Sequence, residues 1–462
     1  MAFLHHPARR VREPDGKQNL LMSAPRPNFI SRFFPAKVIG VTLAAAAVIG
    51  SACAFFLWSL EWVTRTRFEH PWLLYLLPLA GMLVGWTYHR HGGPSEGGNN
   101  LIIDRIHDPG AGLPRRMAPL VLFGTLVTHL FGGSAGREGT AVQMGGSIAA
   151  AVSRHFNLNV DQIRLLLMAG VAAGFGAVFG TPLAGAVFAV EVLIIGKPKW
   201  HALPVCLLAS FVGDQACRVW GVGHTHYHID GVAEHLPIFY LSPFLLGKVA
   251  LAAVAFGLVS LLFSESCHRV GAAFKRWIPR PVLRPAVGGA TVIGLFLIVG
   301  RADYLGLGVW SPDLGAVSLV SMFSGMEARP SDWLWKLVFT AVTIGSGFKG
   351  GEVTPLFFIG AALGSALAAV MGVPPELFAA LGFVAVFAGA SNTPMACTLM
   401  GMELFGAVHV IPIALACGVA FLCSGHSGIY LSQRVGTPKP GRKGTGPLRR
   451  LREKRGSRGD AE

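Results

Sequence analysis

The sequence predicts an all-α protein that crosses a membrane several times. Hydrophobic residues make up 52% of the 462 positions, charged residues only 14%, and the mean hydropathy is +0.53. A soluble enzyme with one buried helix does not reach such values. The apolar runs are also interrupted by many of the 59 glycines, as in transporters built from broken, closely packed helices. The composition therefore favours a polytopic transport protein.

The predicted membrane segments are mostly short, and few approach the roughly 20 apolar residues that span a bilayer. In chain order they cover 37–62, 71–88, 118–131, 141–152, 165–179, 183–195, 203–212, 243–263, 286–299, 333–344, 356–370, 377–388 and 411–422. Glycine or proline interrupts several of them. This pattern indicates helices that start or stop inside the membrane.

Positive charge gathers at the two ends of the chain, which has a formal net charge of +15. The basic residues there are Arg9, Arg10, Arg12, Lys17 and Arg32 at the start, and Lys439, Arg442, Lys443, Arg449, Arg450, Arg452, Lys454 and Arg455 in the tail. Basic flanks stay in the cytoplasm, so we expect both termini inside, an even number of crossings and a place in the cell membrane, the inner one in a Gram-negative cell. A cytoplasmic flank explains the tail better than nucleic-acid binding does. The first apolar run is too long for a signal peptide, so we expect it to be retained.

Cysteine and histidine spacing predicts no metal site. The cysteines are scattered and indicate neither a disulfide framework nor a zinc site; they are Cys53, Cys206, Cys217, Cys267, Cys397, Cys417 and Cys423. His224, His226 and His228 alternate in a loop, but only Asp230 is near them as a further ligand. Packing of the loop is the better interpretation. We expect no metal and no cofactor.

Two halves of the chain repeat the same order of features. Thr181-Pro182-Leu183-Ala184 is followed by Glu191, and Thr393-Pro394-Met395-Ala396 is followed by Glu403 at the same distance. Each block lies downstream of a glycine-rich segment that contains a glutamate. Matching breaks in two halves are typical of a transporter whose site forms between repeats. We therefore predict membrane repeats at 37–217 and 236–433, a polar linker at 218–235, and basic segments at 1–36 and 434–462.

Glu138, in Gly136-Arg137-Glu138-Gly139-Thr140, is the strongest candidate for a functional residue. It lies between the apolar runs 120–133 and 141–152, and a carboxylate at membrane depth normally marks an ion or proton pathway. The glycines beside it break the helix and expose backbone amides, which attract anions. The segment therefore predicts competition between a titratable carboxylate and an anion. The alternative is a glycine-rich turn with a surface ion pair between Arg137 and Glu138.

These motifs resemble the CLC family of anion channels and transporters. The resemblance rests on Gly136-Arg137-Glu138-Gly139, on Pro-Leu-Ala-Gly at 182–185 and on Gly-x-x-x-Pro at 351–355, and it extends from about Val38 to Arg434. It implies a CLC-type inverted repeat of broken and tilted helices, in a homodimer with one pathway per subunit. It also implies that Glu138 is the external gating glutamate.

Departures from the chloride pattern resemble the fluoride/proton antiporter branch of that family. Where the family carries Gly-Ser-Gly-Ile-Pro, residues 96–101 read Glu-Gly-Gly-Asn-Asn-Leu, and Thr140 stands where proline is usual. Val192 occupies the position of the internal proton-transfer glutamate, next to Glu191. The resemblance implies a proton-coupled antiporter that exports fluoride, with fluoride, protons and membrane lipid as its partners. A chloride channel or chloride/proton antiporter is the alternative.

The anion-binding positions implied by the resemblance combine backbone amides with polar side chains: Gly136, Arg137, Gly139, Asn99, Asn100, Val353, Thr354 and Tyr430. Fluoride is strongly hydrated, so leaving water requires strong donors such as an amide or a hydroxyl. Asn99 and Asn100 fit almost equally, and Asn99 is alternatively a helix cap. Thr354 is alternatively a turn residue, and Tyr430 an interfacial aromatic residue.

Glu352 is a second carboxylate at membrane depth, between Gly351 and Val353. It either supports proton transfer and the anion site or pairs with Lys349, which lies three residues earlier.

An intramembrane serine protease is the interpretation from a different class, because Gly425-His426-Ser427-Gly428 matches the rhomboid Gly-x-Ser-Gly. That chemistry needs a histidine base from a later helix, and no histidine follows His426. We expect no enzymatic activity.

Overall fold

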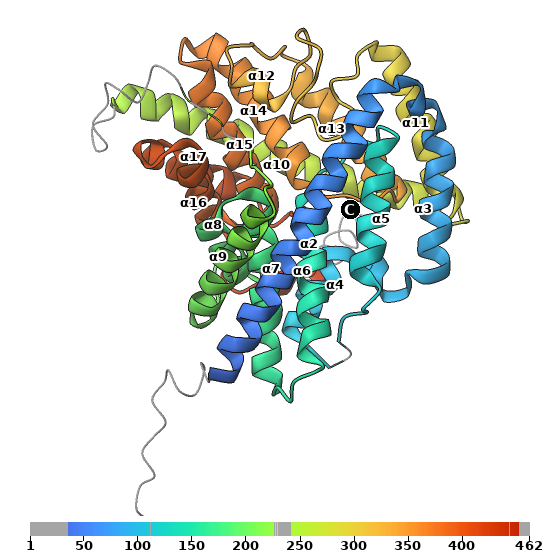
Figure 1. Ribbon diagram of the computed structural model, residues 1–462. Coiled ribbons are helices and arrows are strands. Elements are labelled where there is room, and N and C mark those ends of the chain that lie inside the picture. The colour runs from blue at the N-terminus through green and yellow to red at the C-terminus, as the bar shows by residue number, and fades with distance from the viewer. Residues whose placement is uncertain are drawn as a thin grey trace, which may run out of the picture.

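The computed structural model describes residues 36–110, 112–225, 227, 229, 242–442 and 444–451. These residues form helices almost throughout, as predicted (Figure 1). In Figure 1, α2 (Ala36–Glu69) runs diagonally across the front, with α4 (Gly98–His107), α6 (Glu138–Ser153) and α7 (Val160–Phe179) near its lower end. Helices of the second half lie mainly in the upper part of the view.

The remaining elements follow in chain order. The first half adds η1 (Pro71–Leu76), α3 (Leu77–His91), η2 (Gly93–Gly97), α5 (Met117–Leu130), α8 (Pro182–Glu191), η3 (Trp200–Ala202) and α9 (Leu203–Val219). The second half contains α10 (Pro243–Trp277), α11 (Leu283–Val299), α12 (Leu319–Met322), α13 (Asp332–Ser346), α14 (Val353–Met371), α15 (Pro375–Ser391), α16 (Pro394–Phe405), η4 (Ala407–His409) and α17 (Val410–Cys423).

Long and short helices are mixed in this fold. Six helical stretches within the described ranges are long and apolar enough to cross a bilayer: 36–69, 71–91, 160–179, 200–219, 243–277 and 353–371. Others, such as α8 and α16, are too short to span one. Many helices begin with proline, which lacks the N–H that a first-turn residue leaves unpaired.

The predicted repeat is visible in how two helix pairs are broken. Helix α7 ends at Gly180 and α15 at Asn392, both in the left-handed conformation with φ of 69° and 59°. Each is followed by a Thr-Pro step that starts a short helix, α8 at Pro182 and α16 at Pro394. A left-handed residue ends a helix by turning the chain, and proline then fixes the start of the next one.

The predicted helix over 183–195 is too long. Helix α8 ends at Glu191, and Ile194–Ile195 instead forms strand β1. β1 pairs in parallel with β2 (Arg434–Val435), which pairs antiparallel with β3 (Gly446–Pro447). The two isoleucines pack in different places: Ile195 lies with Val435 and Leu448 in a small separate cluster, whereas Ile194 packs against the main core.

Three α-helices of the described residues, α4, α12 and α16, are absent from the predicted membrane segments, and α12 is only four residues long. Helix α4 carries Asp104 and Arg105, and only its isoleucine face is buried. Helix α16 is short and contains Glu403, so no long apolar run marks it. The even number of crossings is not tested by the structure. The arginines before residue 36, His226, His228, Asp230, Lys443 and the tail beyond residue 451 lie outside the described residues.

Candidate functional site

Two glycine-rich loops, one from each half, meet inside the protein. Gly136 and Gly351 exchange both backbone hydrogen bonds, with N···O distances of 2.6 and 2.7 Å. A Cβ at Gly351 would lie 2.7 Å from the amide nitrogen of Gly139, so only glycine fits there. The pairing brings the N-terminus of α6 against the N-terminus of α14. Partial positive charge from two helix ends therefore converges at one place.

Glu138 occupies this place as an anion would. It is the first residue of α6 and is only 2% exposed. The Thr354 hydroxyl donates to its carboxylate at 2.6 Å, and the Thr354 amide donates at 3.1 Å. The amide of Arg137 adds a bond at 3.1 Å. The carboxylate thus binds the exposed amide end of α14 and closes it.

Arg137 is close to Glu138, but the pair is not the surface ion pair considered above. Its Nε lies 3.6 Å from Glu138 Oε1 and has no hydrogen-bond partner among the described residues. Because Glu138 is buried, the alternative of a solvated turn is wrong. Arg137 instead contributes positive charge beside the carboxylate.

Glu352 does not pair with Lys349 in this structure. The Lys349 ammonium lies 4.1 Å from the centroid of the Tyr88 ring, and no ion pair joins it to Glu352. Glu352 Oε2 is buried without a hydrogen-bond partner among the described residues. A buried, unpartnered carboxylate oxygen is costly, which is the usual mark of a functional group.

The two asparagines have different environments. Asn100 Oδ1 accepts a hydrogen bond from the Ser432 amide at 2.9 Å, so Asn100 holds the C-terminal segment. Asn99 lies against the site, because a Cβ at Gly139 would be 2.9 Å from its Nδ2. Its Oδ1 is buried and has no partner in the described part of the chain. Neither residue caps a helix, since the N-cap of α4 is Gly97. The Nδ2 group of Asn99 forms no hydrogen bond with a described residue, so this donor, and not the unpartnered Oδ1, is the part of Asn99 available to an anion.

Other predicted site residues line the same region. Val353 and Thr354 form the first turn of α14 and are both 2% exposed, so Thr354 is not a surface turn residue. Tyr430 is only 4% exposed, so it lies inside the protein and not in an exposed interfacial belt. Its ring meets Phe188 edge-on. These positions surround the junction of the two loops.

Cavities reach the junction from two faces of the protein. One, of about 680 Å³, is lined by Arg137, by the later part of α2 and by the end of α7. The other, of about 780 Å³, is lined by Glu352, Lys349 and Asn100 and by the end of α3. The chain reverses direction at η1 between α2 and α3, so the later part of α2 and the end of α3 lie on opposite faces. Arg137 lines the first cavity and Glu352 the second, so the loop junction that holds Glu138 lies between residues of both.

Glu191 and Glu403 have a structural role that the sequence only hinted at. The Glu191 carboxylate accepts bonds from the amides of Met395 and Ala396 at 3.1 and 2.8 Å. Glu403 does the same for Leu183 and Ala184 at 2.9 and 2.8 Å. Each half therefore caps a short helix of the other half. The equal spacing in the two repeats was the signal, but it could not show that the contact crosses between them.

Val192 and the Gly-x-Ser-Gly segment complete the set of predicted positions. Val192 is buried, and its carbonyl accepts a bond from Gln433 Nε2 at 2.9 Å. Ser427 donates to Glu265 at 2.7 Å, while His426 Nε2 accepts from the Lys439 amide. Serine and histidine in this segment thus have separate partners.

Known proteins have similar sequences over most of this chain. The sequence profile described as voltage gated chloride channel matches residues 80–425. A chloride/fluoride channel protein of Pseudomonas syringae pv. tomato is 49% identical over 404 residues, which cover 87% of this chain and 88% of that protein. A putative chloride channel protein ClcB-like of Ralstonia nicotianae is 29% identical over 384 residues, covering 77% and 83%.

Solved structures give the same answer for the fold. The crystal structure of a CLC-type fluoride/proton antiporter matches with a TM-score of 0.80 at 34% identity, covering 86% of this chain and 97% of that one. A slow cyanobacterial chloride/proton antiporter matches with a TM-score of 0.68 at 18% identity, covering 84% and 94%, which shows the fold alone. The family resemblance seen in the motifs is confirmed, and this multi-pass membrane protein belongs to the CLC family of anion channels and transporters.

Proposed function

We propose that this protein is a proton-coupled antiporter that exports fluoride. The observation that carries the proposal is the Glu138 carboxylate bound to the hydroxyl and amide of Thr354 at the end of α14. A helix N-terminus is an anion site, so the carboxylate and a mobile anion compete for the same donors. Protonation of Glu138 weakens its hold on these donors and admits the anion. Each exchange then moves a proton against an anion.

The choice of fluoride is supported by the donors around the junction. The segment 96–101, which lies where chloride-type members carry Gly-Ser-Gly-Ile-Pro, offers Asn99 and no serine, and Thr354 adds a hydroxyl in the second loop. A small, strongly hydrated anion needs such short, strong donors when it leaves water. The 34% identical solved antiporter, which carries fluoride, supports the same assignment. Chloride transport, in a channel or an antiporter, is the second candidate.

We propose Glu138 as the proton carrier, with Glu352 in a supporting role. Val192 cannot titrate, so the inner half of the path lacks a carboxylate at that position. Glu352 lines the cavity of about 780 Å³ and has an unpartnered oxygen, so it is placed to receive a proton or to organise an entering anion. Both carboxylates act at one loop junction.

Reconstituted protein gives the direct test. Liposomes loaded with fluoride or with chloride are monitored for anion efflux and for proton uptake at the same time. We expect fluoride efflux in strong preference to chloride, with protons entering in step. Equal efflux of both anions would contradict the fluoride assignment and support chloride transport. Fluoride efflux without proton movement makes it a channel.

We further propose a homodimer in the cell membrane, with both termini in the cytoplasm and one pathway per subunit. The family supports the assembly, and the basic ends of the chain support the orientation. Cross-linking in native membranes should trap a dimer, and single cysteines placed at each end should react only with membrane-permeant reagents. A monomer, or labelling of either end from outside, would contradict this arrangement.

We propose no proteolytic activity. Ser427 donates to Glu265, and the neighbouring His426 accepts the Lys439 amide through Nε2, so these bonds do not form the serine–histidine pair that such a protease uses. The Ser427→Ala variant should transport fluoride normally. Cleavage of a membrane substrate by the wild type and not by this variant would reverse the assignment.

A further inference from the structure

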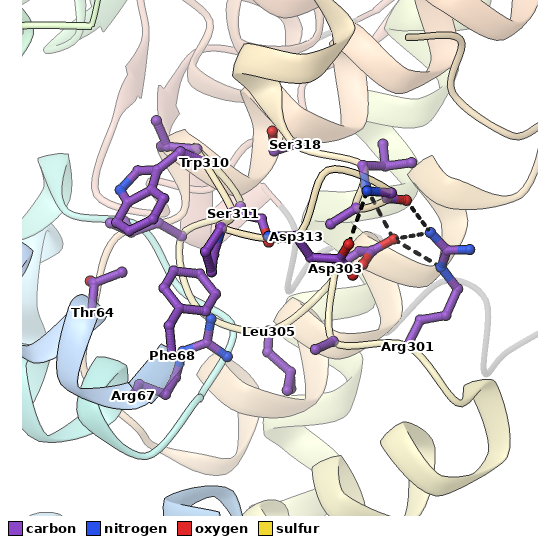
Figure 2. Close-up of a pocket in the computed structure, with 18 of the residues that line it drawn as sticks. Thr64, Arg67, Phe68, Arg301, Asp303, Leu305, Trp310, Ser311, Asp313 and Ser318 are labelled. Atoms are coloured by element: carbon purple, nitrogen blue, oxygen red, sulfur yellow. Dashed lines mark hydrogen bonds and ion pairs between the residues drawn. The ribbon is translucent and has the colours of Figure 1, made fainter. Parts of the chain in front are cut away.

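A third cavity, next to the one lined by Arg137, contains a buried arginine without an acidic partner. The cavity has a volume of about 480 Å³ and lies between the end of α2 and the loop of residues 300–318 (Figure 2). Arg67 and Phe68 of α2 form one wall, and Arg301 and Asp303 lie on the other side. Arg67 is only 8% exposed.

The guanidinium of Arg67 makes no hydrogen bond and no ion pair with any described residue. The guanidinium carbon, Cζ, lies over the face of the Phe68 ring, 4.3 Å from the ring centroid. The N–H donors of the guanidinium have no partner among the described residues, and because none of its nitrogens is a fully buried unpartnered atom, they are accessible from the cavity. Burying a charge in this way is costly unless an opposite charge compensates it.

The acidic residues of the cavity do not supply that charge. Asp303 is bound to Arg301 at 2.6 Å and also accepts a bond from the Val317 amide. Asp313 is exposed and accepts from the amide of Gly315 in its own loop. Asp303 is therefore already bonded to protein groups, and Asp313 is exposed to solvent.

A second buried cation lies behind the same loop. Lys336 is fully buried, and its ammonium donates to the carbonyls of Tyr304 and Gly306 at 3.2 and 2.8 Å. The nearby Asp332 accepts from the Tyr304 hydroxyl at 2.6 Å and from a backbone amide, and it forms no ion pair with Lys336. The loop therefore lies between two buried positive charges, with one cavity open to an outside ligand.

We infer that this cavity binds a small anion, a halide or a short carboxylate, on the guanidinium of Arg67. A guanidinium offers paired donors to such an anion, and the aromatic rings of Phe68 and Trp310 cover the site, with their centroids 4.9 Å apart. Neither Glu138 nor Arg137 lines this cavity, which adjoins the cavity of about 680 Å³ through shared lining residues of the loop, Leu307, Val309 and Trp310. The binding itself does not depend on the proposed function.

The position of the site connects it to the loop that holds Glu138. A Cβ at Gly132 would lie 3.6 Å from Arg67 Cδ, and the Gly132 carbonyl accepts a bond from the Gly306 amide at 3.4 Å. Gly132 begins the turn that continues to Glu138. An anion that orders Arg67 and the 300–318 loop also steadies this turn. This effect on the gate, unlike the binding, rests on the proposed function.

Thermal unfolding of the purified protein, titrated with sodium bromide or sodium acetate against sodium gluconate at constant ionic strength, tests the binding. Arg65→Gln is the matched control, since Arg65 is two residues away, exposed, and paired with Glu61. We expect saturable stabilisation of the wild type and of Arg65→Gln. For Arg67→Gln the apparent dissociation constant of the anion should rise about tenfold or more, because the charged guanidinium and its paired N–H donors are lost. Bromide against acetate distinguishes the halide from the carboxylate.

Three results would overturn the inference. They are no saturable response in the wild type, an equal response in all three proteins, which would mean binding elsewhere, and a bromide anomalous signal in crystals that lies away from Arg67. Should Arg67→Gln fail to fold, Arg67→Lys keeps the charge without the fork and should still weaken binding about tenfold. In liposomes, external bromide should change the fluoride efflux rate of the wild type and of Arg65→Gln but not of Arg67→Gln. Identical effects on all three would refute the connection to the gate.

Discussion

In two places a glutamate of one half caps a helix of the other half, and the two places differ in a way that separates gating from assembly. At the gate, Glu138 binds Thr354 at the end of α14, while its counterpart Glu352 binds no amide of α6 and leaves an oxygen unpartnered. At the clasp, formed by Glu191 and Glu403, each carboxylate binds two amides of the opposite short helix. The clasp is complete and reciprocal, whereas the gate is one-sided.

The difference indicates which of these carboxylates can leave its helix end during transport. A reciprocal contact satisfies both halves, so breaking either side leaves two helix-terminal amides without their carboxylate partner. A one-sided contact can open if an anion takes the place of the carboxylate on α14. The following variants test this division between gate and clasp.

The largest expected effect is on Glu138→Gln. An amide has nearly the shape of the protonated acid but cannot exchange protons at working pH, so proton coupling should be abolished. The coupling is measured as proton uptake and fluoride efflux, recorded together, in liposomes that contain the variant. Glu403→Gln is the matched control, because it makes the same chemical change at a carboxylate that caps a helix, and it should keep coupling. Proton-coupled fluoride transport by Glu138→Gln would show that Glu138 is not the gating residue.

Thr354→Val should have the next largest effect. The change removes the hydroxyl that donates to Glu138 at 2.6 Å and nearly keeps the side-chain volume. A hydrogen bond to a charged group is worth about 1.5–3 kcal/mol, so the closed gate should weaken by about a factor of ten or more. We expect a corresponding rise in fluoride leak without proton uptake. Thr354→Ser retains the hydroxyl and should resemble the wild type; an equal leak in both variants would show that the hydroxyl does not hold the gate.

Glu352→Gln should lower coupled proton flux by a smaller factor, several-fold, if Glu352 supports the carrier without replacing it. Lys349→Met separates this role from simple charge pairing. Since Lys349 contacts Tyr88 and not Glu352, its loss should leave the coupling ratio unchanged. Normal coupled transport by Glu352→Gln would reduce Glu352 to a structural residue. A loss in both variants would restore the pairing interpretation.

Much of the fold could be predicted because its signals are local. Proline at the start of α8 and α16, glycine before the gate and the long apolar runs each fix one element without help from the rest of the chain. The functional site was harder to predict from the sequence. Asn99 and Asn100 are neighbours of the same type, and only the contact of Asn100 with Ser432, far along the chain, distinguishes them.

Contacts between the halves explain the remaining errors. Ile194–Ile195 looked like the end of a membrane helix, and only its pairing with Arg434–Val435 makes it a strand. The role of Arg67 was also invisible, since an arginine after a long apolar run looks like an ordinary interfacial residue. Its burial depends on a loop that comes more than half the chain later.

The smallest expected effects are on the clasp and concern stability alone. Glu191→Ala leaves the first amides of α16 without partners and should lower the free energy of unfolding by about 1–3 kcal/mol. Glu403→Ala should cost less, because Glu403 is more exposed than Glu191, which is 4% exposed. Unfolding in mild detergent measures both losses, and liposome assays should show an unchanged ratio of protons to fluoride. Should either variant lose coupling while it remains folded, the clasp would be part of the transport cycle, and the distinction between a moving and a fixed carboxylate would fail.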